Sequence, residues 1–326
     1  MVPDMTPPAA AADFLAAHGW GDAEIAPLAG DASFRRYFRV SGGNGRAVLM
    51  DAPPPHEDPR PFLAIARWLG ERGFAAPRIL ADDAAAGLVL LEDFGDVRMR
   101  ETVDARPDAA DRLYSAAIDV LVALHKHPAG PLKPYDRAEL QREAGLFVDW
   151  YCPAVGLTVD GEGYRAAWDA VLGVALDRRE TVTVLRDYHA ENLMLIDDGK
   201  GLGLLDFQDA LAGHPAYDLV SLLQDARRDV APDIEAAMRT RYAQATGAGH
   251  DFAAAYAVLG AQRNAKILGI FTRLWKRDGK PRYAAMCPRV WRYLERDLAD
   301  PALAPVADWF AANVPPAKRG DPMEVA

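Results

Sequence analysis

Two neighbouring segments decide how this chain folds: VLRDYHAENLML, residues 184–195, and GLLDFQD, residues 203–209. They place Asp187 five positions before Asn192 and put Asp206 at the end of a short apolar run. Phosphoryl transfer from a nucleotide requires a carboxylate that orients the attacking hydroxyl, and an amide and a carboxylate that hold Mg²⁺. The two segments therefore predict a catalytic loop flanked by short strands, with Asp187 at the acceptor hydroxyl and Asn192 and Asp206 at the metal.

This prediction depends on the joint pattern, because an isolated aspartate is most often a turn or capping residue. Arg186 directly precedes Asp187, apolar strand-like residues lie on both sides of the loop, and Asp206 follows at a distance typical of kinases. A neutral amide such as Asn192 can bind a hard cation without adding repulsion beside phosphate groups. We therefore expect ATP and Mg²⁺ as cofactors.

The length, charge and cysteine content of the chain argue against several classes of protein. The chain has 326 residues, long for a single core and sufficient for two lobes. Its net charge of −10 argues against a nucleic-acid-binding surface, and no apolar run approaches the roughly 18 residues of a membrane span. Cys152 and Cys287 have no metal-ligand spacing, so we expect free thiols in a reducing cytoplasm. We also expect a monomer.

The hydrophobic periodicity changes near Gly95. Strand-like runs separated by glycine-containing turns precede it, and long helical patterns follow it. We therefore predict an α+β fold that resembles the two-lobe protein-kinase-like fold. A small β-rich nucleotide lobe is expected at 13–94, a larger helical lobe for catalysis and acceptor binding at 95–314, and flexible ends at 1–12 and 315–326. The predicted strands are 25–29, 34–40, 47–51, 78–81, 87–91 and a β-like region at 182–205; the predicted helices are 61–72, 108–125, 137–151, 163–176, 217–228, 234–245, 252–275 and 282–298.

The nucleotide phosphates are expected at GDASFRRYFRV, residues 30–40, because backbone N–H groups in a loop between strands can bind phosphate. The segment has a single glycine, so it is not a Gly-x-Gly-x-x-Gly loop. An ordinary β-turn followed by a strand with basic residues on its solvent face is the alternative. The predicted nucleotide contacts in this segment are Gly30, Ser33, Phe34, Arg35 and Arg36.

The third predicted strand departs from the usual kinase pattern. In the run AVLM, Met50 stands where a lysine normally binds the α- and β-phosphates. Either the chain is inactive or another cation takes this role, and Arg35 or Arg36 is the candidate because a guanidinium can grip phosphate with two hydrogen bonds. For the adenine, the strand that ends in LEDFG predicts backbone contacts from Glu92 and Phe94.

The segments LDFQDA, residues 205–210, and GHPAYDL, residues 213–219, resemble the pattern of the aminoglycoside phosphotransferase and choline kinase branch of the protein-kinase-like superfamily. The resemblance implies that Asp187 is the catalytic base and that Asn192 and Asp206 are the magnesium ligands. It also implies that Asp218 is a structural residue that stabilises the loops of the large lobe.

Aromatic residues beside polar groups mark two further segments, LFVDWY at 146–151 and RNAKILGIF at 263–271. Proteins hold sugars in this way, with the apolar ring face on an aromatic side chain and the hydroxyls on polar groups. The same aromatic residues fall at helical spacing, so a place in the helical core is the alternative. The expected acceptor contacts are Asp187, His189, Glu191, Gln208, Trp150, Arg263 and Asn264.

Taken together, the runs GDASFRRYFRV, LMDAPP, DYHAEN, RNAKILGIF and DGKPRY resemble the bacterial cell-wall amino-sugar kinases, over nearly the whole chain. The resemblance implies ATP-dependent phosphorylation of the anomeric hydroxyl of N-acetylmuramate or N-acetylglucosamine during peptidoglycan recycling. It also makes Met50 an expected feature of the chain. N-acetylmuramate carries a lactyl carboxylate, for which Arg263, Lys266 and Lys280 are the candidate cations.

Two other functions remain open at this point. One is a kinase of another small alcohol, such as an aminoglycoside, choline or homoserine. Cationic acceptors of that kind call for clustered acidic residues, whereas the C-terminal region here is basic and aromatic. The other is a nucleotide-binding pseudokinase, which Met50 favours and the complete set of Asp187, Asn192 and Asp206 opposes.

Overall fold

The computed structural model describes residues 5–28, 34–130, 132–177 and 181–325. The chain forms two compact units. The β unit contains residues 1–106 and 191–209, and the helical unit contains residues 107–190 and 210–326. This division differs from the predicted boundary at residue 94, because residues 95–106 and 191–209 also belong to the β unit.

A five-stranded antiparallel sheet in the order β1-β2-β3-β5-β4 forms the centre of the β unit. All five strands that the sequence predicts for this lobe are present. Met50 of β3 pairs with Tyr37 of β2, and Arg36 pairs with Asp51. The strands are β1 (Glu24–Pro27), β2 (Arg36–Gly42), β3 (Gly45–Asp51), β4 (Ile79–Asp83) and β5 (Leu88–Glu92).

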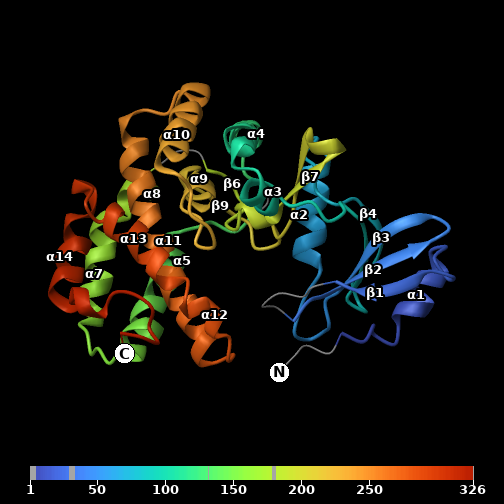
Figure 1. The fold of residues 1–326 in the computed structure, drawn as a ribbon, viewed down its shortest axis with the longest axis horizontal. Helices are drawn as coiled ribbons and strands as arrows, with labels where there is room; N and C mark the ends of the chain where they lie inside the picture. The colour runs from blue at the N-terminus through green and yellow to red at the C-terminus, as the bar shows by residue number, and fades with distance from the viewer. Residues whose placement is uncertain (1–4, 29–33, 131, 178–180, 326) are drawn as a thin grey trace. The chain divides into compact units, whose positions relative to one another are not determined.

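One face of this sheet carries the core of the β unit. Alternate residues of β2, including Phe38 and Val40, are buried there. Helix α1 (Ala11–Ala17) covers the face with Phe14 and Leu15 and lies beside β1 in Figure 1. The predicted flexible segment 1–12 therefore runs into a helix from Ala11 onward, because an apolar pair at adjacent helical positions anchors it to the sheet.

The hairpin of β7 (Leu193–Ile196) and β8 (Gly201–Leu204) belongs to the β unit. Leu195 N–H donates to the carbonyl of Val97 at 2.7 Å, and Leu204 N–H donates to that of Ala75 at 2.7 Å. Helix α3 (Met99–Ala105), which the sequence did not predict, contacts β7. After the hairpin, Phe207 stacks on Phe62 of α2 (Arg60–Gly70) with ring centroids 5.0 Å apart. These contacts hold the segment that carries Asp206.

The helical unit is organised around α11 (His250–Lys276), which contacts α5, α9, α12 and α13. Figure 1 shows α14 beside α7 at one edge of this unit. Two short strands, β6 (Val182–Val184) and β9 (Leu211–Gly213), pair within it. The other helices are α4 (Ala110–Leu124), α5 (Arg137–Leu146), α6 (Cys152–Ala154), α7 (Gly161–Val171), α8 (Gly173–Leu176), α9 (Ala216–Leu223), α10 (Pro232–Thr246), α12 (Pro281–Ala284), α13 (Cys287–Asp297) and α14 (Ala304–Asn313).

Besides α3, several helical features differ from the predicted pattern, and the helix expected at 282–298 is divided into α12 and α13. The helix expected at 137–151 changes to a π-helical turn at Phe147–Tyr151, and the one expected at 163–176 is split into α7 and α8. Helix α14 was not predicted. The described part of the predicted flexible tail is packed: Tyr151 Oη donates to the carbonyls of Lys318 and Gly320, and Asp321 is buried. Hydrogen bonds from a residue far away in the sequence hold this tail, which local composition does not reveal.

No helix among the described residues has the length and apolarity needed to cross a membrane.

Gly269→Ala tests the close crossing of α11 with the end of α5. A Cβ at Gly269 would lie 2.3 Å from the backbone carbon and oxygen of Leu146. Backbone atoms cannot move aside as a flexible side chain does, so we expect the free energy of unfolding to fall by about 1–3 kcal/mol or more. Denaturation in urea measures this loss.

The matched control is Gly145→Ala, on α5, where an added Cβ would meet nothing within 4 Å. This change should be neutral or stabilise the helix by up to ~1 kcal/mol. Similar losses for both variants would show that the crossing is not close-packed.

Candidate active site

Asp187 lies in a loop that begins directly after β6 in the helical unit. Its side chain is partly exposed, whereas the flanking Leu185 and Tyr188 are buried. Arg186 has a φ of 71°, which is uncommon for a residue other than glycine. The surrounding bonds must hold this conformation, since a β-carbon disfavours it.

Asp218 of α9 holds the start of the loop. Its carboxylate oxygens accept hydrogen bonds from the N–H groups of Leu185 at 2.7 Å and Arg186 at 2.8 Å. Burial raises the pKa of Asp218 to about 7, while these two N–H bonds act to lower it. Since the ionised carboxylate accepts both bonds best, Asp218 matches the structural role implied by the sequence resemblance.

Glu143 of α5 holds the side chain of Arg186. Arg186 donates to Oε1 of Glu143, and Tyr135 donates to Oε2. Lys266 Nζ lies 2.8 Å from Oε1. Burial raises the pKa of Glu143, but the charges of Lys266 and Arg186 outweigh burial, so the pKa lies below its ordinary value. Glu143 is therefore a buried carboxylate between two cations.

The far end of the loop is held by two further side chains. Tyr188 Oη donates to the carbonyl of Ala117 in α4 at 2.8 Å. Arg227 Nη1 lies 3.1 Å from Nε2 of His189. Because a guanidinium can only donate, Nε2 of His189 must accept. His189, which the sequence placed at the acceptor, is thus buried and bonded to Arg227.

The predicted metal ligands lie together in the β unit. Asn192 Nδ2 is 3.4 Å from Oδ2 of Asp206, and Gln208 Nε2 donates to Oδ1 of Asp206 at 2.8 Å. Asp206 is exposed and has a φ of 59°, so it has the same uncommon backbone conformation as Arg186. Glu191, another predicted acceptor contact, forms an ion pair with Arg100 of α3.

These side chains suit a magnesium ion that is shared with a nucleotide. Within the described ranges, no group of three or more His, Cys, Asp or Glu side chains is placed to hold a metal. Mg²⁺ commonly takes one or two protein oxygens and completes its shell with water and phosphate. A carboxylate and an amide that converge, as Asp206 and Asn192 do, fit that requirement.

The predicted phosphate loop is described only in part, because Gly30 and Ser33 lie outside the described residues. Phe34 is 66% exposed and stacks on His56 with ring centroids 5.2 Å apart. Arg35 Nε lies 3.7 Å from a carboxylate oxygen of Glu57.

Arg36 points away from the position of the missing lysine. Its Nε donates to Oδ2 of Asp51 at 2.8 Å, and its guanidinium lies 5.9 Å from the ring of Phe38 in the core face. Successive residues of a strand face opposite sides of the sheet, so Arg36 lies on the side opposite to Tyr37 and its partner Met50. The structure therefore separates the two arginines that the sequence treated as equivalent.

The predicted adenine contacts have roles within the β unit. The N–H of Glu92 donates to the carbonyl of Arg78 at 2.9 Å, so it is not available to a base in this structure. The ring of Phe94 packs against Gly203, where an added Cβ would lie 2.6 Å from it. Asp93, which sequence reasoning missed, accepts from Arg39 Nε at 2.8 Å and Gly95 N–H at 2.8 Å. This network orders the strand end.

The structure does not support two of the predicted acceptor contacts. Arg263 and Asn264 of α11 are 2% and 0% exposed. Arg263 donates to Oγ of Ser221, and Asn264 donates to Gln224 Oε1 and Asp297. They face the core of the helical unit because α11 is surrounded by helices. Trp150 lies in the π-helical turn and is partly exposed.

Sequence reasoning also missed Glu143 and Arg227. Glu143 stands in a helix without a local motif, so nothing in the sequence connects it with Arg186. Arg227 lies in the charged run QDARRD that directly follows α9. That run was a usable signal, since the preceding helix carries Asp218.

A sequence profile of the phosphotransferase enzyme family matches residues 24–256, which cover most of the chain and include Asp187, Asn192 and Asp206. The chain belongs to the phosphotransferase enzyme family. An N-acetylmuramate/N-acetylglucosamine kinase from Caulobacter vibrioides is 41% identical to this phosphotransferase, over 94% of this chain and 96% of the relative. A protein of the same name from Pseudomonas aeruginosa is 42% identical over 92% of each chain.

Solved structures share the fold of this phosphotransferase at low sequence identity. A choline kinase from Streptococcus pneumoniae aligns with a TM-score of 0.61 and 13% identity, over 86% of this chain and 93% of its own. An aminoglycoside phosphotransferase from Streptomyces rimosus, in complex with ADP and streptomycin, aligns with a TM-score of 0.56 and 19% identity, over 78% of this chain and 96% of its own. These similarities confirm the predicted protein-kinase-like α+β fold.

Glu143→Gln tests the buried charge network of this phosphotransferase. Glutamine keeps the shape but leaves Arg186 and Lys266 without a counter-charge, so we expect the free energy of unfolding at neutral pH to fall by about 3–5 kcal/mol. The folded pKa of Glu143 lies below the ordinary value of about 4.3, so its contribution is present above that pH and is lost as the pH falls through the folded pKa. The variant should therefore show a weaker acid dependence of stability in urea denaturation.

Glu139→Gln is the matched control on the same helix. Glu139 pairs with Arg142 at the surface, where such pairs contribute about 0–1 kcal/mol. Equal losses for the two variants, or an unchanged acid dependence in Glu143→Gln, would contradict the proposed charge network.

Proposed function

We propose that this phosphotransferase transfers the γ-phosphate of ATP to the anomeric hydroxyl of N-acetylmuramate or N-acetylglucosamine, as a step of peptidoglycan recycling. The observation that carries the proposal is the identity of 41% and 42% to two kinases named for these sugars, over nearly the full length of each chain. The sequence pattern of the Asp187 loop and the Asp206 segment supports a phosphoryl-transfer reaction independently of those names.

Asp187 orients the acceptor hydroxyl in this proposal. An anomeric hydroxyl is more acidic than an ordinary alcohol, so a well-positioned carboxylate can promote its attack on phosphorus by orientation and late proton acceptance. The four side chains that hold the loop, Asp218, Glu143, Tyr188 and Arg227, support this role because they fix the backbone on both sides of Asp187. A carboxylate held in one geometry loses little entropy when the hydroxyl binds.

Asn192 and Asp206 would hold Mg²⁺, and Gln208 would orient the carboxylate of Asp206 through its amide. When bound, the ion neutralises phosphate charge and positions the γ-phosphate for transfer. The contacts of β7 and β8 with the rest of the β unit keep Asp206 at a fixed place for this purpose.

Arg35 is the cation that we propose for the role of the missing strand lysine. It lies beside β2 and near Glu57, whereas Arg36 is committed to Asp51 on the face of the sheet opposite Met50. We further propose that the protein works as a monomer in the cytoplasm. The two cysteines are buried free thiols, which suits a reducing compartment.

Substitution of each arginine by alanine separates these two roles. We expect Arg35→Ala to raise the KM for ATP by about tenfold or more, because a phosphate contact is lost, while stability changes little. Arg36→Ala should mainly lower stability, since it leaves the buried carboxylate of Asp51 unpaired. Steady-state kinetics and thermal denaturation measure the two effects. An unchanged KM for ATP in Arg35→Ala would refute the assignment.

The reaction itself is tested by incubating the protein with ATP, Mg²⁺ and each sugar in turn. We expect a phosphate monoester at the anomeric carbon, identified in NMR by coupling of the anomeric proton and carbon to phosphorus. Asp187→Asn should lower kcat by about 10²–10⁴-fold without a comparable loss of stability. Phosphate on a ring hydroxyl would refute the anomeric assignment, and turnover with only aminoglycoside or choline acceptors would refute the proposed substrate class.

A further inference from the structure

The two proposed sugars differ by one charged group. N-acetylmuramate carries a lactyl carboxylate that N-acetylglucosamine lacks, so an enzyme that uses both must accommodate this charge without requiring it. In a chain with a net charge of −10, a carboxylate near the catalytic loop needs a nearby cation. This question rests on the proposed function.

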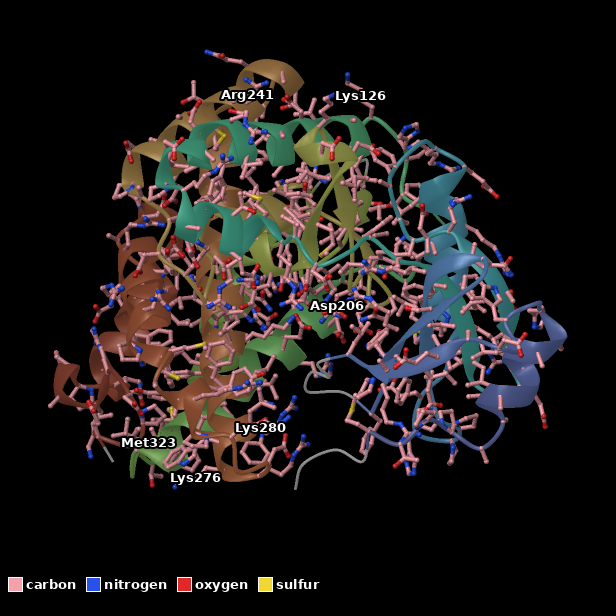
Figure 2. All side chains as sticks on the ribbon, turned by 45° about the vertical axis from the view of Figure 1, so that its right-hand side comes forward. Lys126, Asp206, Arg241, Lys276, Lys280 and Met323 are labelled. Atoms are coloured by element: carbon pink, nitrogen blue, oxygen red, sulfur yellow. The ribbon has the colours of Figure 1, made fainter. Side chains whose placement is uncertain are left out.

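The three cations suggested by the sequence are poorly placed for this task. Arg263 is buried and donates to Ser221, and Lys266 is 9% exposed and paired with Glu143. Lys280 is partly exposed, but it follows α11 near Lys276, at the end of the helical unit opposite to Lys126 and Arg241 (Figure 2). The partners of Arg263 and Lys266, Ser221 and Glu143, lie outside the catalytic loop.

Arg227 does contact the catalytic loop, within the same unit as Asp187. Helix α9 supplies Asp218 to the start of the loop, and the segment that follows this helix returns to the end of the loop. There the carboxylate of Asp225 accepts the N–H of Arg227 at 2.8 Å and fixes its backbone. The guanidinium then reaches His189, two residues after Asp187, at 3.1 Å.

The chemistry of this contact suits a binding role. A guanidinium carries five N–H donors in a planar fork, so it can donate to an imidazole and to a carboxylate at the same time. Arg227 is partly exposed, unlike Arg263. Its neighbour Arg228 donates to Tyr114, whereas the guanidinium of Arg227 contacts His189 of the loop.

We propose that Arg227 binds the carboxylate of the acidic acceptor and thereby sets the preference between N-acetylmuramate and N-acetylglucosamine. His189 is the positioning residue that holds the guanidinium at the end of the loop. The neutral sugar is oriented without this contact, which allows both substrates to use the same loop.

Arg227→Ala tests the proposal by comparing the two sugars. We expect kcat/KM for N-acetylmuramate to fall by about 10- to 100-fold, as for the loss of a charge-assisted hydrogen bond, and kcat/KM for N-acetylglucosamine to change less than about threefold. The methyl ester of N-acetylmuramate keeps the lactyl group but replaces its charged carboxylate by a slightly larger neutral ester, so its kcat/KM should be insensitive to the substitution. Arg228→Ala removes the adjacent guanidinium and should leave the ratio between the sugars unchanged.

Three kinetic outcomes would overturn the proposal. An equal loss for both sugars would mean that Arg227 acts only on the loop, through His189. An unchanged value for N-acetylmuramate would mean that no contact exists. A lower kcat/KM for N-acetylmuramate alone in Lys280→Ala, with no such change in Arg227→Ala, would assign the carboxylate of the sugar to Lys280.

Calorimetric binding of N-acetylmuramate separates this proposal from the proposed function. Wild type that binds the sugar more tightly than Arg227→Ala, but transfers no phosphate to it, would support the contact and refute the kinase activity. Transfer to the anomeric position with equal affinity in wild type and Arg227→Ala would support the kinase activity and overturn the contact.

Discussion

The structure around the proposed acceptor site depends on one carboxylate, that of Asp218, which accepts the N–H groups of Leu185 and Arg186. These two bonds bend the chain as it leaves β6 and allow Arg186 its left-handed backbone. Asp187 comes next, so its position follows from the position of Asp218. Because Asp218 is buried in α9, the packing of the helical core directly sets the position of Asp187, the proposed catalytic carboxylate.

Charge inside the helical unit supports the same loop. Glu143 joins Arg186 to Lys266 and Tyr135, so the arginine before Asp187 is fixed at its side chain as well as at its backbone. Burying these groups costs solvation energy, which their mutual attraction offsets only while every partner is present. The sequence suggested Lys266 as a substrate-binding cation. In the structure Lys266 pairs with Glu143 and so helps to support the loop.

The β unit has Met50 at the strand position where the usual kinase pattern has a lysine. Met50 is fully buried and paired with Tyr37 in the sheet. Arginine–aspartate pairs surround the strands: Arg36 with Asp51, and Arg39 with Asp93. These pairs order the strand ends. Arg35, which belongs to the predicted phosphate loop, lies just before the first residue of β2.

The sequence by itself determined the fold class and the order of Asp187, Asn192 and Asp206, because these depend on local spacing and on strand and helix periodicity, and the resemblance of its motifs indicated the family. It did not separate Arg35, which precedes β2, from Arg36, which lies in β2 and pairs with Asp51. It also placed Arg263 and Asn264 at the acceptor, although α11 buries them, and it overlooked Glu143 and Arg227. Only the tertiary structure decided these cases, because burial and pairing depend on residues that are distant in the chain, and no local pattern records which charges meet when the helices pack.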